Sequence, residues 1–114
     1  MYNRDTLFLL EDIIESCLKI KRYTEGLDYE SFVNDDKTKD AVVRNFEIIG
    51  EVSTVIHEDF KKKHPQINWR EIKDFRNRMI HDYAGIDYQI VWTIITEFIE
   101  ELEFQVNQII KDYN

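Results

Sequence analysis

The sequence predicts an all-α protein, an antiparallel bundle of four main helices plus one short helix. The 114 residues include only three glycines and one proline, so few positions interrupt a helix. Apolar residues recur at spacings of three and four along most of the chain, as on a helix with one buried face. The joints between these periodic segments are short, which favours antiparallel neighbours. With this length we expect a single domain over residues 1–114.

The first predicted helix follows Asn3 or Asp5, either of which can cap it. It ends at Gly26, after the basic Lys21 and Arg22, which suit the negative end of the helix dipole. Its expected core stripe consists of seven apolar residues, Leu7, Leu10, Ile13, Ile14, Cys17, Leu18 and Ile20.

A short helix is expected over residues 28–33, and a second long helix over residues 37–63, before Pro65. Gly50 lies inside the long helix, where glycine costs roughly 1 kcal/mol relative to alanine. Close approach of another helix would explain it, and so would a ligand. The expected core stripe is Ala41, Val42, Phe46, Ile49, Val52, Val55, Ile56 and Phe60.

Asn68 is expected to cap the third long helix, with Glu71 in the capping-box position. The helical pattern loosens over residues 81–85, and Asp87 then caps a last long helix that runs to about residue 111. The third helix should bury Trp69, Ile72, Phe75 and either Met79 or Ile80. The last helix should bury Ile90, Val91, Ile94, Ile95, Phe98, Leu102, Val106 and Ile109.

Charge is distributed unevenly along the chain. The net charge is −8, which argues against general nucleic-acid binding. Residues 61–78 nevertheless carry seven basic and two acidic side chains, a net charge of +5, so the rest of the chain carries −13. One positive island in an acidic protein can attract a phosphate locally. The alternative for the lysines Lys61, Lys62 and Lys63 is a solvated helix end.

Several classes of site and location are not expected. No apolar run approaches the ~18 residues of a membrane span, and no basic leader precedes the first helix, so we expect a soluble cytoplasmic protein without membrane contact. The lone Cys17 cannot form an internal disulfide. We expect no metal, because His57, His64 and His81 do not share a ligand spacing. We expect no cofactor, because no Walker or dinucleotide-binding loop is present.

The residues best suited to chemistry are Arg76 and His81. An arginine fork fits phosphate oxygens, and a histidine exchanges a proton near neutral pH, so the pair suits phosphodiester cleavage. On a straight helix the two would point about 140° apart. Either the helix ends or bulges between them, or the pair acts with a second copy across a dimer interface. Asn77, four residues before His81, could contact the phosphate or orient the imidazole.

Asp82 and Tyr83 are the next polar groups within reach of His81. The simplest alternative gives none of these residues a chemical role. His81 would then be a histidine at a helix terminus, and Tyr83 a core aromatic with its hydroxyl at the surface.

The segment R-N-R-M-I-H-D-Y, residues 76–83, resembles the R-x4-H-x-Y motif of HepT-type toxins in the HEPN superfamily of ribonucleases. The segments R-N-F-E-I-I-G-E at 44–51, W-R-E-I at 69–72 and I-D at 86–87 also resemble that family. The resemblance covers nearly the whole chain. It implies a HEPN-like fold and a metal-independent RNase, built as a homodimer whose two motif copies line a cleft at the interface.

The resemblance also implies roles for single residues. Arg76 and His81 match the catalytic pair, and Asn77 matches the polar position beside the arginine. Tyr83 matches the tyrosine that an MntA-type nucleotidyltransferase, the cognate antitoxin, modifies with AMP and thereby silences the toxin. The chain would then be the toxin of a type VII toxin–antitoxin system.

Four further residues are expected to support the site or bind RNA: Arg70, Lys73, Arg78 and Asp82. Two other interpretations remain open. One is a non-catalytic helical subunit that presents a substrate or nucleotide to a nucleotidyltransferase. The other is a dimeric scaffold without chemistry.

Overall fold

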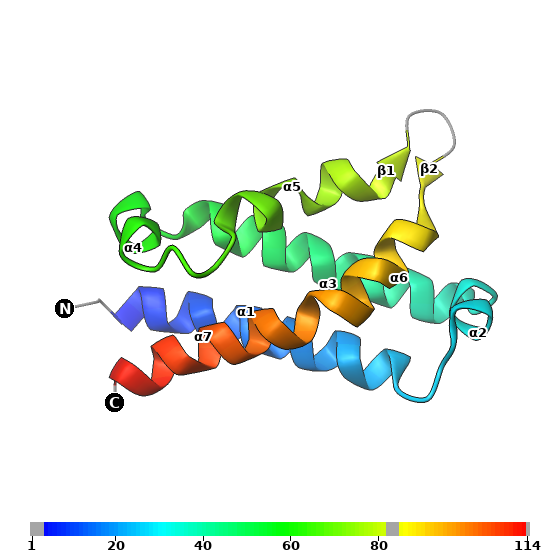
Figure 1. Ribbon diagram of the computed structural model, residues 1–114, viewed down its shortest axis with the longest axis horizontal. Helices are drawn as coiled ribbons and strands as arrows, with labels where there is room; N and C mark the ends of the chain where they lie inside the picture. Colours follow the sequence, from blue (N-terminus) through cyan, green and yellow to red (C-terminus); the bar gives the residue numbers. More distant parts are fainter. Residues whose placement is uncertain (1–3, 82–84, 114) are drawn as a thin grey trace.

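The computed structural model describes residues 4–81 and 85–113, and for His81 it describes the backbone alone. The described chain is an all-α bundle that carries a small β-ribbon, so the predicted fold class is confirmed (Figure 1). The elements in chain order are α1 (Arg4–Thr24), α2 (Tyr29–Val33), α3 (Asp36–Val55), α4 (Glu58–Lys63), α5 (Trp69–Met79), β1 (Ile80–His81), β2 (Gly85–Ile86), α6 (Tyr88–Glu97) and α7 (Ile99–Tyr113).

The long helices pack in the order α7, α1, α3 and α5. Figure 1 shows them running side by side, with the start of α1 and the end of α7 at the same end of the bundle. Phe75 of α5 stands edge-on to Phe46 of α3, with ring centroids 5.3 Å apart, and to Phe98, with centroids 5.4 Å apart. Each such pair adds about 0.5–1.5 kcal/mol beyond area burial. This aromatic cluster fixes α5 against the bundle.

Helix α1 agrees with its prediction except at one position of the core stripe. Leu10, Ile13, Cys17 and Ile20 are fully buried. The prediction for Leu18 is wrong, because 46% of its surface is exposed. At about 100° per residue, Leu18 lies on the side of Cys17 away from the buried Ile13 and Ile20, and so faces solvent.

The helix predicted over residues 37–63 is split into α3 and α4. The α-helix ends at Val55, and Ile56 is extended, with φ −72° and ψ 135°. The hydroxyls of Ser53 and Thr54 donate to the carbonyl oxygens of Gly50 and Glu51 at 2.8 and 2.7 Å, a pattern that destabilises and bends helices. Val55, predicted to be buried, is therefore 66% exposed.

The helix predicted over residues 87–111 is also divided, at Phe98, whose φ is −121° and ψ −37°. Hydrogen bonds from Phe98 N to Ile94 O and from Leu102 N to Phe98 O continue across the joint, so the chain bends there without a loop. The hydroxyls of Thr93 and Thr96 donate to carbonyl oxygens four residues earlier, which favours a bend. The bend brings the Phe98 ring onto Phe75.

The predicted short helix over 28–33 is present as α2, and its Asp28 cap accepts from Ser31 N at 2.8 Å. Within the described ranges, α4 is a second short helix that the sequence did not separate from its neighbour. No helix among the described residues is long and apolar enough to cross a membrane.

Candidate functional site

Helix α5 begins with the capping interactions that the sequence predicts. Glu71 N donates to Asn68 Oδ1 at 3.0 Å, and Asn68 Nδ2 donates to Glu71 Oε2 at 3.1 Å. Trp69 Nε1 donates to the His64 carbonyl oxygen at 2.9 Å, which ties the start of α5 to the end of α4. The N-terminal end of the helix is thereby fixed.

One face of α5 is fully buried and consists of Ile72, Phe75 and Met79. Met79, and not Ile80, completes the stripe, since Ile80 is 44% exposed. The predicted site residues of this helix lie on its other faces, and all are exposed to solvent: Arg70, Lys73, Arg76, Asn77 and Arg78.

The helix ends between Arg76 and His81. This is one of the two alternatives that the 140° offset between their positions on a straight helix left open. Ile80 leaves helical geometry with φ −89° and ψ 128°, and β1 pairs with β2 in antiparallel register, Ile80 with Ile86 and His81 with Gly85. Asp87 N donates to Met79 O at 2.6 Å and closes the base of the ribbon. Arg76 therefore lies on the last turn of a helix and His81 on a strand, so the 140° helical offset does not apply.

The ribbon stands beyond the end of α5 in Figure 1. The sequence did not predict it, because two-residue strands leave no alternating pattern to detect. Gly85 has φ +84°, in the left-handed region that favours glycine. The side chain of His81, and all of Asp82 and Tyr83, lie outside the described residues. The pairing of Arg76 with His81 and the role of Tyr83 as the modified tyrosine therefore stay predictions.

The basic side chains of α5 differ in their partners. Arg78 Nη1 donates to Glu71 Oε1 in an ion pair along the helix surface. Arg70, Lys73 and Arg76 form no ion pair within 4 Å with any other residue that the structure describes. These three are free to meet an anion, whereas Arg78 must first leave Glu71.

A cavity of about 190 Å³ lies beside Arg76, between α3 and α5. Seven residues line it: Phe46, Glu47, Gly50, Glu51, Thr54, Lys73 and Arg76. Sequence reasoning singled out Gly50, Lys73 and Arg76 but missed the two glutamates. The spacing 47, 50, 51 and 54, which places residues on one helical face, was the available signal.

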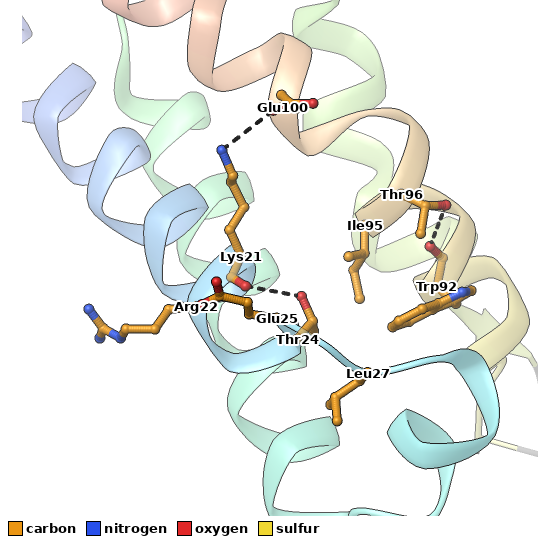
Figure 2. Close-up of a pocket in the computed structure, with 9 residues that line it drawn as sticks. All are labelled: Lys21, Arg22, Thr24, Glu25, Leu27, Trp92, Ile95, Thr96 and Glu100. Carbon is orange, nitrogen blue, oxygen red and sulfur yellow. Dashed lines mark hydrogen bonds and ion pairs between the residues drawn. The ribbon is translucent and has the colours of Figure 1, made fainter.

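A larger cavity of about 440 Å³ opens between the end of α1 and the α6–α7 joint (Figure 2). Figure 2 shows Lys21 extending toward Glu100, with the Trp92 ring on the other wall. Lys21 Nζ lies 2.9 Å from Glu103 Oε1 and 3.8 Å from Glu100 Oε1. The hydrogen bond to Glu103 raises the pKa of Lys21. This lysine is charged and already paired with two carboxylates, and none of the predicted site residues lines the cavity.

Other reactive groups do not form a second centre in the described part of the chain. The described side chains, those of residues 4–80 and 85–113, include no group of three His, Cys, Asp or Glu that could hold a metal ion. Burial raises the pKa of the Cys17 thiol to about 12, so this buried thiol stays protonated.

Comparisons with known proteins agree on one family. The family model described as ribonuclease HepT-like matches residues 13–109. A "Putative RNase" of Methanocaldococcus jannaschii is 40% identical over 93% of this chain and 97% of its own. The "Probable ribonuclease HepT" of Thermococcus cleftensis is 44% identical over 82% of this chain and 86% of its own. No solved structure matches the chain significantly.

Proposed function

The chain belongs to the HepT-like ribonuclease family, and we propose that it cleaves RNA with Arg76 and His81, without a metal ion. The observation that carries the proposal is the position of Arg76. It is exposed on the last turn of α5, without an ion-pair partner among the described residues, and the β-ribbon that bears His81 follows directly. A phosphate bound by Arg76 would therefore lie near the histidine.

The proposed reaction uses the 2′-hydroxyl of the RNA as the nucleophile. His81 either takes the 2′-OH proton while water protonates the leaving 5′-oxygen, or delivers a proton to the leaving 5′-oxygen while water accepts the 2′-OH proton. The 2′-oxygen forms a bond to phosphorus, the bond to the 5′-oxygen breaks, and a 2′,3′-cyclic phosphate is left. Arg76 stabilises the charge on the non-bridging oxygens. Asn77, on the same turn as Arg76, contacts the phosphate or orients the imidazole.

Arg70 and Lys73 support the proposal as contacts for neighbouring phosphates. Both are exposed on α5 and form no ion pair with another described residue. Arg78 joins them when an RNA phosphate competes with Glu71. The sequence outside this island is strongly acidic, so RNA affinity depends on these few side chains and falls as salt rises.

The active unit that we propose is a homodimer, with the two motifs facing each other across a cleft. The proposed regulator is a nucleotidyltransferase antitoxin that attaches AMP to Tyr83. AMP two residues from His81 adds a phosphodiester anion, which Arg76 or Arg78 can hold through charge-assisted hydrogen bonds. The anion then occupies the place of the substrate. The chain would be the toxin of a type VII toxin–antitoxin pair.

The test is cleavage by the purified protein in the presence of EDTA, on an RNA and on a DNA of the same sequence. The 2′-hydroxyl requirement predicts that only the RNA is cut. Cutting of both, or activity that EDTA abolishes, would contradict the proposal. A protein that cuts neither but binds a nucleotidyltransferase would favour the alternative of a non-catalytic helical subunit. The net charge of −8 also favours that alternative, because it opposes general binding of nucleic acid.

A further inference from the structure

Gly50 lies in the middle of α3, where glycine weakens a helix relative to alanine. A Cβ at this position would lie 3.4 Å from the Ile72 carbonyl oxygen of α5, at the short end of ordinary van der Waals contact. An alanine therefore fits between the two helices without displacing either. Close packing of α3 on α5 does not by itself require this glycine.

The same glycine lines the 190 Å³ cavity beside Arg76. A side chain at this position would reduce the open space between Phe46 and Thr54, which line the cavity from the same helix. The missing side chain at Gly50 thus keeps the cavity open, whereas the packing of α3 on α5 does not need it. This favours the second explanation of an interior glycine, the approach of a ligand.

The polar walls of the cavity are complementary. Glu47 of α3 is half-buried and makes no hydrogen bond or ion pair with another residue in the described ranges. Lys73 and Arg76 reach the cavity from α5 and form no ion pair with other described residues. Glu51 is exposed and lies 3.7 Å from Arg44. One wall therefore accepts hydrogen bonds through Glu47, and the other donates them.

We propose that this cavity is a base-binding subsite that takes a guanine next to the phosphate held by Arg76. The proposal rests on the function proposed above, and it names the substrate class of that site. The cavity is smaller than the roughly 300–1,000 Å³ that drug-sized ligands occupy, so it suits one flat ring system. Unstacked bases of single-stranded RNA are commonly read in this way, through their hydrogen-bonding edges.

Guanine fits the two walls better than the other bases. Its N1–H and 2-amino group are adjacent donors that match the two oxygens of one carboxylate, here Glu47. Its O6 and N7 are acceptors that match a basic side chain, here Lys73, which would then contact the base in place of a neighbouring phosphate. Adenine and cytosine present an amino group beside a ring acceptor, and uracil presents one N–H between two carbonyls. Neither pattern offers a carboxylate two adjacent donors.

The test measures binding of short uridine-rich RNAs with 2′-O-methyl groups throughout, which cannot be cleaved through the 2′-oxygen. Each carries one guanosine, adenosine, cytidine or inosine, and affinity is read from fluorescence anisotropy. The parent should bind the guanosine RNA about tenfold more tightly than the adenosine RNA. Inosine lacks the 2-amino group and should lie between them.

Two variants and one control locate the effect. Glu47→Gln should reduce the ratio of guanosine to adenosine affinity severalfold. Gly50→Ala should weaken binding of the guanosine RNA while the melting temperature stays the same or rises, which excludes misfolding as the cause. Glu11→Gln, on the exposed surface of α1, is the matched control and should behave as the parent.

Equal affinity of the parent for all four RNAs would overturn the subsite. So would a Glu47→Gln variant that weakens every RNA by the same factor, because Glu47 would then act through Arg76 and not on the base. Cleavage is measured separately. A guanosine preference in binding without any cleavage would refute the proposed nuclease and leave the subsite standing.

Discussion

At the scale of single residues, Arg76 and Arg78 lie two positions apart on α5 but differ in their ion pairs. Arg78 is paired with Glu71, whereas Arg76 faces a cavity and has no ion-pair partner among residues 4–81 and 85–113. An exposed pair such as Arg78–Glu71 contributes about 0–1 kcal/mol to stability. The arginine without a pair is the one available to stabilise a developing charge.

Arg76→Ala should lower the rate of RNA cleavage by ~10²–10³, the usual cost of losing one donor to a transition state. Arg78→Ala is the matched comparison and should cost less, because that side chain is held by Glu71. Circular dichroism should show the same helix content in both variants. Equal losses in the two variants would contradict the role assigned to Arg76.

Tyr83→Phe removes the hydroxyl that is proposed to receive AMP. Intact-mass analysis after incubation with ATP and the cognate nucleotidyltransferase should show added AMP on the parent and none on the variant. The variant should also remain toxic in cells that express the partner, unless the partner inhibits by binding alone. AMP located on another residue, or none on the parent, would remove the toxin–antitoxin interpretation.

At the scale of elements, the sequence predicts helix caps well and helix interruptions poorly. Asn68 with Glu71 and Asp87 both cap the helices expected of them, because a cap is decided by residues two or three positions apart. The breaks at Ile56 and Phe98 escape prediction. The apolar spacing runs through both, and the bends depend on tertiary packing of Phe98 against Phe75 and on hydroxyls that bond backward.

The candidate site shows the same limits. The motif from Arg76 to Tyr83 is the basis of the proposed chemistry, and the cavity residues Glu47 and Glu51 emerge only when α3 is placed against α5. The signs in the sequence that this face of α3 is special were the glycine at position 50 and the helical spacing of residues 47, 50, 51 and 54. The short β-ribbon could not be predicted from periodicity, yet it determines where the chain leaves α5 before His81.

His64 joins α4 to α5 and provides a pH-dependent prediction. Burial lowers the pKa of His64, Lys63 lowers it further, and Asp112 opposes the shift. Because the folded state binds this proton less tightly than the unfolded state, stability should fall as the pH drops through about 6.5. The melting temperature should fall more between pH 7 and pH 5 for the parent than for His64→Gln. Parallel pH profiles would contradict this assignment.

At the scale of the whole molecule, the proposed active unit is a dimer with Arg76 and His81 of both copies near the interface. Light scattering at micromolar concentration should give twice the mass of the 13.9 kDa chain. Dilution should reduce the cleavage rate per chain once dimers dissociate. A fully active monomer would contradict a site shared between two copies. Arg76 and His81 of one chain would then be sufficient for cleavage.

The most direct measurement is the chemical nature of the RNA ends left by the purified protein in EDTA. The parent should produce a 2′,3′-cyclic phosphate and a free 5′-hydroxyl, because the 2′-oxygen attacks its own phosphate and His81 moves the protons. His81→Ala should produce neither, with helix content unchanged. A 5′-phosphate and a 3′-hydroxyl, or equal cleavage by His81→Ala, would contradict the central claim that Arg76 and His81 cleave RNA without a metal.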